Sequence, residues 1–169
     1  DMIGDGDPAG CLPTAGGFVF AASSNPPNAT RGSMDKDLVI GIDSSTTATK
    51  AIAFDRAGRL VAEGRSSVAL SNPRPGFYEQ DANDWWRSTC AALGELGAKI
   101  DMGRVAALAI ANQRETVVPV DASGQPLGPA MTWLDERGRE DVLLLGKKLG
   151  RDRLLAITGK TPDPTPGVY

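Results

Sequence analysis

An acid followed by a run of small hydroxyl residues stands at the end of an apolar segment. Residues 38–42 are apolar, Asp43 comes next, residues 44–49 are small and mostly hydroxylated, and Lys50 follows. This order predicts a buried strand that ends at the acid, a polar turn, and a second strand over 51–54. A carboxylate held beside backbone N–H groups and hydroxyls suits a hydrated Mg²⁺ ion and nucleotide phosphates. The plain alternative is a β-hairpin with a Ser/Thr-rich turn.

Two adjacent charges follow a second apolar segment, residues 105–111. The next residues are Asn112-Gln-Arg114-Glu115-Thr116, and open α/β sheets bind ligands beyond the carboxyl ends of such strands. Arg114 can donate a rigid fork of hydrogen bonds to vicinal hydroxyls, and Glu115 can accept from one or two of them. The pair therefore suits a polyol or sugar, whose hydroxyls both donate and accept. A salt-bridged pair in a loop is the alternative.

A tryptophan with charges close by forms a third candidate segment, Trp133-Leu-Asp135-Glu-Arg137. An aromatic plane that packs on C–H groups beside hydrogen-bonding charges is a common way to hold a carbohydrate. Trp133 can equally be an ordinary core residue. Both interpretations stay open at this point.

These three segments resemble the FGGY family of carbohydrate kinases, and they come in the family's order. Asp43-Ser-Ser-Thr-Thr-Ala-Thr-Lys50 is similar to the family's first phosphate loop, which is of the type found in actin-like ATPases. The family usually has glycine where Ser45 stands, and glycine allows a backbone to approach a phosphate closely. Residues 112–116 are similar to the segment that holds glycerol in glycerol kinases, and residues 75–81 resemble a further FGGY segment.

The resemblance implies ATP- and Mg²⁺-dependent phosphorylation of a hydroxyl on a polyol or sugar. It implies an α/β fold of the ribonuclease-H-like (actin-like ATPase) type, a mixed sheet with helices, of which this chain would hold an incomplete N-terminal domain. The general base, an aspartate, is expected beyond Tyr169, so the isolated chain is expected to be inactive. The implied nucleotide-binding residues are Asp43, which would also orient Mg²⁺, Thr46, Thr47 and Lys50, and the implied acceptor-binding residues are Arg114, Glu115, Trp133 and Asp135.

Three interpretations of the ligand stay open. Glycerol kinases have a tyrosine in the slot that Thr165 fills here, and the smaller residue leaves room for an acceptor longer than three carbons. Asp135, Arg137 and Lys50 resemble the xylulokinase pattern, which makes a pentulose the second interpretation. The third belongs to another class: a non-catalytic domain that binds carbohydrate or a partner.

The amino-acid composition limits the classes of partner and of catalytic site that the chain can have. The 169 residues are 41% apolar and 23% charged, as in a soluble globular domain, and a net charge of −3 does not favour nucleic acid or an anionic membrane as a partner. The chain has no histidine, which excludes a Ser-His triad. Cys11 and Cys90 stand in unlike contexts, so we expect reduced thiols and a cytoplasmic protein. The expected partners are a small-molecule acceptor and the remainder of the kinase, and the oligomeric state, including a homo-oligomer, stays open.

Four strands are predicted to position the candidate residues. Three of them, over 38–42, 51–54 and 60–70, form a meander with a turn at Gly58. The apolar run 105–111 predicts a fourth strand, buried, parallel and reached through a helix. The result is a mixed sheet.

Helices and shorter strands complete the prediction. Asp81 is the candidate N-cap of the helix before the parallel strand. Two strands over 117–120 and 130–133 and two helices over 140–149 and 151–157 are expected later, with a Pro/Gly-rich loop over 158–169. The residues of the first helix that are predicted to face the sheet are Trp86, Cys90, Leu93 and Ile100, with Leu96 beside them.

Residues 1–34 are predicted to be a disordered leader or an appended segment. They are rich in Gly, Pro, Ala, Ser and Asn and cannot bury enough surface to offset their ordering entropy. Residues 35–169 would then form the first part of the FGGY N-terminal, substrate-binding domain. Mass spectrometry of the natively expressed protein tests this boundary: a mature N-terminus near Met34 supports it, and one near Asp1 contradicts it.

Overall fold

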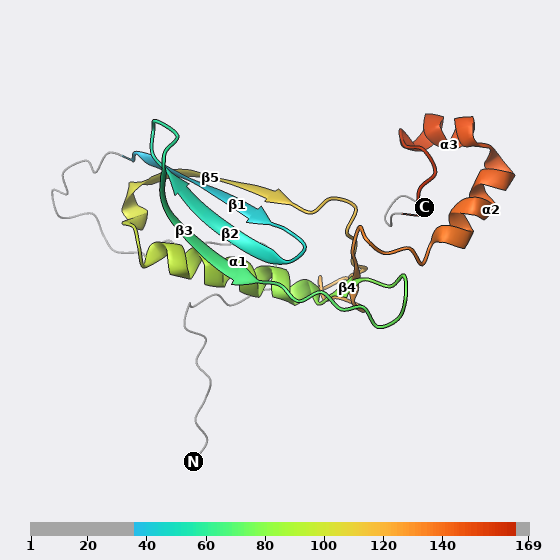
Figure 1. Cartoon of the computed structure of the whole chain (residues 1–169), viewed down its shortest axis with the longest axis horizontal. Helices are drawn as coiled ribbons and strands as arrows, with labels where there is room; N and C mark the ends of the chain where they lie inside the picture. The colour runs from blue at the N-terminus through green and yellow to red at the C-terminus, as the bar shows by residue number, and fades with distance from the viewer. Residues whose placement is uncertain (1–35, 165–169) are drawn as a thin grey trace, which may run out of the picture.

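A four-stranded mixed sheet forms the centre of the computed structural model, which describes residues 36–164. The strand order is β3-β2-β1-β5 (Figure 1). The predicted meander and the predicted parallel pairing are both confirmed. β1 (Leu38–Ser44), β2 (Ala48–Phe54) and β3 (Leu60–Ser67) are antiparallel neighbours, and β5 (Val105–Asn112) pairs with β1 in parallel.

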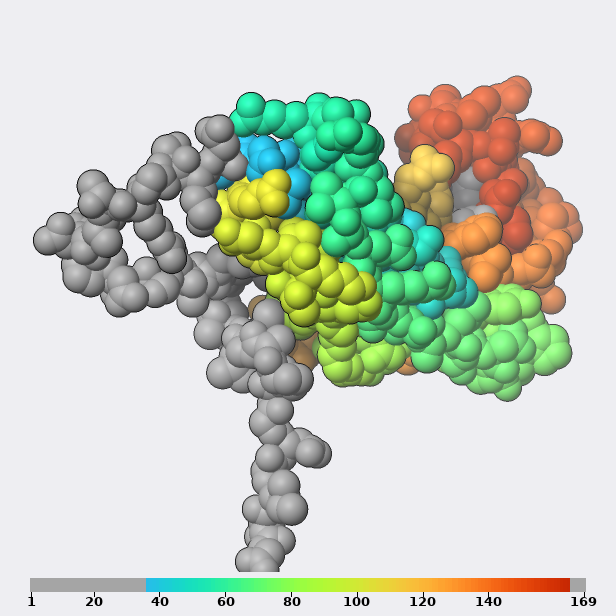
Figure 2. Space-filling model, turned by 60° about the vertical axis from the view of Figure 1, so that its left-hand side comes forward, coloured from blue at the N-terminus to red at the C-terminus, as the bar shows by residue number. Residues whose placement is uncertain are grey.

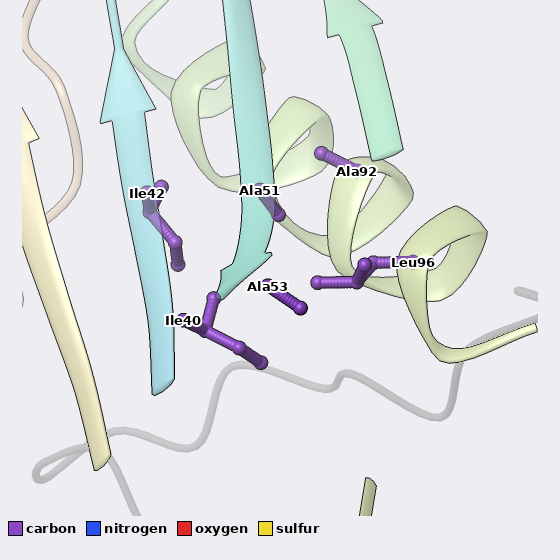
Figure 3. Packing of buried hydrophobic residues seen from close by; sticks show 6 residues of the cluster. All are labelled: Ile40, Ile42, Ala51, Ala53, Ala92 and Leu96. Carbon is purple, nitrogen blue, oxygen red and sulfur yellow. The ribbon is translucent and has the colours of Figure 1, made fainter. Parts of the chain in front are cut away.

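One long helix, α1 (Ala82–Gly97), covers one face of the sheet, mainly over β2 and β3. Its N-cap is Asp81, as predicted, because the side chain accepts a 2.9 Å hydrogen bond from Asn83 N–H. Alternate residues of β1 and β2 point at this helix and form the core (Figure 3). The core residues are Ile40, Ile42, Ala51, Ala53, Ala92 and Leu96.

Gly64 on β3 lets α1 lie close to the sheet. A Cβ atom at this position would lie 2.6 Å from Leu96 N of the helix, which is closer than side-chain atoms pack. Small residues on α1 complete the contact: Ala92 is fully buried, and the Ser88 hydroxyl shares a 2.7 Å hydrogen bond with that of Thr49. The helix therefore meets β3 through backbone and small side chains.

The buried face of α1 agrees with the predicted one only in part. Ser88, Ala92 and Leu96 are buried at a spacing of four residues, whereas Trp86 is 38% exposed and Leu93 is only partly buried. The predicted Leu93, Leu96 and Ile100 do pack on the core. The prediction was wrong for Trp86 and missed Ser88 and Ala92, because it favoured the largest apolar side chains. The close approach at Gly64 admits smaller ones.

β5 is parallel but not buried, which corrects another prediction. Almost all of the strand is exposed, and Ile110 is 63% exposed. β5 lies at the edge of the described sheet, and α1 lies mainly over β2 and β3. Apart from Val105, which packs against the core at the start of the strand, neither face of β5 is covered by residues 36–164.

Short elements replace the full strands that were predicted after β5. β4 (Glu79–Gln80) pairs with β6 (Ala130–Met131) in a two-stranded sheet. The predicted strand over 117–120 is reduced to single bridges, one of which joins Val117 to β6. Pro119 accounts for this interruption, because proline cannot donate to a strand ladder.

Two helices end the described part of the chain. α2 (Arg139–Leu149) and α3 (Arg151–Thr158) confirm the predicted helices to within one residue, and Gly150, with φ of 79°, separates them. They lie beyond the carboxyl end of β5, at the opposite end of the molecule from the 3₁₀ turn η1 (Met102–Arg104) (Figures 1 and 2). The predicted leader 1–34 and Thr165 lie outside the described residues.

Candidate functional site

Asp43 lies at the carboxyl end of β1, on the face of the sheet opposite α1. Ile42 beside it points into the core, and alternation along the strand turns Asp43 the other way. The antiparallel register places Asp43 opposite Lys50 of β2, so the two side chains share one face. The carboxylate is exposed, and within residues 36–164 it makes no hydrogen bond or ion pair. It is therefore open to a ligand.

The turn after Asp43 is closed by hydrogen bonds from Ser45. Ser45 N–H and Ser45 Oγ both donate to Ala48 O, at 2.9 and 2.8 Å. Glu115 is the one non-glycine residue with a positive φ in the part of the chain that the structure describes. Ser45 thus keeps an ordinary backbone conformation, and the turn does not need the freedom of a glycine at this position.

Trp133 joins the turn after β1 to the segment after β5. Its indole Nε1–H donates to Thr46 Oγ1 at 2.9 Å, and its backbone N–H donates to Thr116 Oγ1 at 3.2 Å. The residue is 46% exposed, so it is not a core tryptophan. The structure therefore brings all three candidate segments of the sequence together around this side chain.

Arg114 and Glu115 form a turn directly after β5. Asn112 at the end of β5 lies beside Ser44 of β1, and Gln113 N–H donates to Ser44 O at 3.2 Å. The residues that follow these two strands are therefore neighbours at one edge of the sheet. Arg114 is exposed, and Glu115 has φ of 66°. A left-handed backbone at a non-glycine residue is strained, and such residues are frequent at ligand sites.

Glu115 is paired with a residue that the sequence did not suggest. Lys160, just after α3, donates to Glu115 Oε1 and forms an ion pair with it. The two residues are 45 positions apart, so no local motif could have linked them. The contact holds the Glu115 carboxylate and brings the segment after α3 to the edge of the site.

Asp135, a predicted acceptor-binding residue, is fully buried. Its carboxylate accepts hydrogen bonds from Arg137 Nε and Nη2 at 2.8 and 2.7 Å and from Tyr78 N–H at 2.8 Å. Burial raises the pKa of Asp135, but the hydrogen bonds from Arg137 and Tyr78 outweigh it and hold the pKa below its ordinary value. Arg137 also donates to Glu79 Oε1 at 2.7 Å. Asp135 thus links its own segment to β4 and does not reach the exposed edge where Asp43 lies.

A buried amide, Gln80 in β4, is a further residue that the sequence did not single out. It is 2% exposed. Its Nε2 donates to Thr46 O at 2.7 Å and to Ala69 O at 3.2 Å, and its Oε1 accepts from Trp85 Nε1 at 3.0 Å and from Gln113 Nε2 at 2.7 Å. The residue type does not indicate this buried role, because glutamine is usually a surface residue.

An open hollow of about 560 Å³ lies between the start of α1 and residues 126–129. None of the predicted site residues lines it, whereas the buried Gln80 does. Among residues 36–164, no group of three or more acidic or cysteine side chains could hold a metal ion. In the same part of the chain, every helix is too short or too polar to span a bilayer.

The chain is similar to known proteins. The model of the N-terminal domain of the FGGY family of carbohydrate kinases matches residues 38–168. A glycerol kinase of Methylorubrum extorquens (strain PA1) is 40% identical over 126 residues, 73% of this chain and 25% of that protein. A xylulose kinase of Klebsiella pneumoniae is 37% identical over 127 residues, 75% of this chain and 26% of that protein.

A solved structure agrees with these sequence relatives. The xylulose kinase from Rhodospirillum rubrum superposes with a TM-score of 0.71 at 29% identity, over 76% of this chain and 27% of that one. The chain thus spans about a quarter of the length of the relatives that it matches.

Proposed function

The chain belongs to the FGGY family of carbohydrate kinases, and from this premise we propose that the protein containing it transfers the γ-phosphoryl group of ATP to a hydroxyl of a polyol or sugar. The mixed sheet with α1 on one face matches the ribonuclease-H-like architecture of that family. The remainder of the kinase would supply the second domain and the rest of the site. We place the reaction in the cytoplasm, where ATP is supplied.

Asp43 fits a magnesium ion that is held mainly through water and phosphate. Mg²⁺ keeps several waters and takes one or two protein carboxylates together with substrate phosphates. One exposed carboxylate at a strand end, unpaired within residues 36–164, meets this need. When bound, the metal would neutralise charge on the transferring phosphates. Asp43 would hold it in place through its hydration shell.

The phosphate oxygens would be bound by Thr46, Thr47 and Lys50. The Thr46 hydroxyl accepts from the Trp133 indole, so its own hydrogen stays available for a phosphate oxygen. Thr47 is exposed on the same turn. Lys50, across the strand pair from Asp43, adds a positive charge on the same face.

Arg114, Glu115 and Trp133 would position the acceptor. The exposed guanidinium of Arg114 can donate to vicinal hydroxyls, and Glu115, held by Lys160, can accept from a hydroxyl. The Trp133 indole N–H is already bonded to Thr46, so its ring offers a plane for C–H groups. We assign Asp135 a different role from the predicted one: because it is buried against Arg137, it holds the Trp133 segment in place.

The observation that carries this proposal is the hydrogen bond between Trp133 Nε1 and Thr46 Oγ1. It joins the ring that would contact the acceptor to the turn that would bind phosphate. Transfer between two bound molecules requires their reacting atoms to come within about 3–3.5 Å of each other. The direct contact between Trp133 and Thr46 supports such an approach, because it keeps the two proposed binding groups close together.

The test is ADP release by the full-length protein with Mg-ATP and a panel of polyols and ketoses. We expect turnover with at least one acceptor and a loss of at least about 100-fold in the Asp43→Asn variant. Asp141→Asn, an exposed acid on α2, is the matched control. Absence of turnover with every acceptor, or equal rates in the two variants, would contradict the proposal. The 169-residue chain alone is expected to show no turnover.

Calorimetry on the full-length protein separates the possible acceptors. Glycerol binding favours a glycerol-like acceptor, and xylulose binding favours a pentulose. Sugar binding without Mg-ATP binding would instead indicate a non-catalytic carbohydrate-binding protein.

A further inference from the structure

The Gln80 side chain contacts three separate parts of the chain. These are the turn at Thr46, helix α1 at Trp85, and Gln113, the residue before Arg114. We propose that Gln80 is a positioning residue for phosphoryl transfer, whose side-chain amide holds the turn at Thr46 in a fixed relation to the corner at Arg114 and Glu115. This inference rests on the proposed function. Its support is the set of four hydrogen bonds that one buried amide makes to segments far apart in the chain.

The orientation of the Gln80 amide is dictated by its surroundings. Its Nε2 faces the carbonyl oxygens of Thr46 and Ala69, which only accept. Its Oε1 faces the Trp85 indole N–H and the Gln113 amide N–H, which only donate. A flipped amide would break all four contacts. Gln80 is therefore a rigid link, with both ends of its amide satisfied.

Gln113 carries this link to the acceptor corner. Its Nε2 donates to Gln80, its backbone N–H donates to Ser44 O, and Arg114 follows it in the chain. Gln113 Oε1 is the one buried side-chain nitrogen or oxygen in residues 36–164 without a hydrogen-bond partner. An unpaired buried acceptor costs free energy. Turning the Gln113 amide would put two oxygens face to face, so the contact with Gln80 decides how Gln113 lies.

Thr46 links Gln80 to both halves of the site. Its carbonyl oxygen is held by Gln80, and its hydroxyl is held by Trp133. A shift of the Gln80 amide would therefore move a phosphate-binding hydroxyl and an acceptor-binding ring together. Displacements of about 1 Å in such groups can reduce the rate of transfer about 100-fold.

The direct test compares three variants of the full-length protein by steady-state kinetics. Gln80→Glu keeps an oxygen for Trp85 and Gln113 but replaces the donor that faces Thr46. We expect the KM for both Mg-ATP and the acceptor to rise about tenfold and kcat to fall, because both halves lose their position. Gln113→Met breaks one contact only, and we expect it to raise the acceptor KM and leave the Mg-ATP KM unchanged.

Asn72→Ala is the matched control. The Asn72 amide donates to Phe77 O at 2.8 Å, an exposed contact that touches neither half of the site. Its kinetic constants should equal those of the wild type. Gln80→Glu constants equal to those of Asn72→Ala would overturn the proposal. If Gln80→Glu does not fold, Gln113→Met decides, and an unchanged acceptor KM overturns the proposal.

A spectroscopic readout separates this inference from the proposed function. In the chain labelled with ¹⁵N at the tryptophan indoles, Gln80→Glu should shift the signals of Trp85 and Trp133, because their partners Gln80 and Thr46 are altered. Unchanged signals for both would overturn the positioning role. This measurement needs no turnover, so a wild-type protein without kinase activity would count against the proposed function alone.

Discussion

Trp133 Nε1 lies 2.9 Å from Thr46 Oγ1 and donates a hydrogen bond to it across 87 residues of sequence. Thr46 belongs to the turn after β1, beside the exposed carboxylate of Asp43. Trp133 is anchored at its backbone to Thr116, just after the exposed Arg114 and the partly buried Glu115. One hydrogen bond therefore joins the side of the sheet edge that suits phosphates to the side that suits a hydroxylated acceptor.

A methyl group at Gly64 should destabilise the fold. Gly64→Ala places a Cβ atom 2.6 Å from Leu96 N, so α1 must move away from β3. We expect a loss of about 1–3 kcal/mol in the free energy of unfolding, as in other overpacked cores. Gly94→Ala is the control, because within residues 36–164 no atom outside the neighbouring backbone of α1 lies within 4 Å of the added methyl group.

Urea unfolding of both glycine variants checks this prediction. Gly94→Ala, on the exposed side of the same helix, should be more stable than the wild type by up to about 1 kcal/mol. Equal unfolding midpoints for the two variants would show that the helix does not approach β3 closely.

Asp135 should make the stability depend on pH in the acid range. Its pKa in the fold lies below the ordinary value of 3.8, so the charged form is favoured by folding. The stabilisation is fully present above about pH 4 and is lost as the pH falls through the lowered pKa. Asp135→Asn leaves the Arg137 charge without this partner, and we expect a loss of about 3 kcal/mol at pH 7.

Urea unfolding at pH 7 and pH 3 measures this dependence. The difference between the wild type and Asp135→Asn should shrink at the lower pH. The exposed Asp141→Asn serves as a control with no such change. A difference that is the same at both pH values would contradict the role of the Asp135–Arg137 pair.

The backbone strain at Glu115 predicts an unusual order of stability. A residue with φ of 66° is disfavoured unless it is glycine. Glu115→Gly should therefore be more stable than Glu115→Ala by about 1 kcal/mol, and both should lose acceptor affinity. Thermal unfolding and calorimetry of the two variants check this, and greater stability of the alanine variant would refute it.

Lys160 should affect binding more than stability. Its ion pair with Glu115 is partly exposed, so Lys160→Met should change the free energy of unfolding by less than about 1 kcal/mol. Acceptor affinity should fall several-fold, because Glu115 loses the contact that holds it. Lys147→Met on α2 is the control. Equal acceptor affinity in both variants would remove Lys160 from the site.

Features with local chemical signals could be predicted from the sequence. Asp81 caps α1 through Asn83 N–H two residues away, and Gly58 and Gly150 take up the positive φ values that their turns require. These interactions lie within a few residues of one another. Such local signals are the reason why the meander, α1 and the two C-terminal helices could be predicted.

Features that depend on distant partners could not be predicted. Ser88 and Ala92 are buried because Gly64 on another element lets α1 approach the sheet, so a helical pattern of large side chains did not indicate them. Gln80 and Lys160 find their partners 34 and 45 residues away, and neither residue type indicates burial or pairing. Asp135 is predicted as an acceptor-binding residue from its place near Trp133, but its carboxylate is buried by contacts with Arg137 and Tyr78, the latter 57 residues away.

A double-mutant cycle on Thr46→Val and Trp133→Phe tests the central claim most directly. Each variant removes one partner of the contact that joins the two halves of the site. In the full-length protein, kcat/KM for the acceptor should show a coupling of about 1 kcal/mol, with the double variant little worse than either single one. Effects that add to within about 0.5 kcal/mol would show that the two halves act independently, and this would contradict a single site at this edge of the sheet.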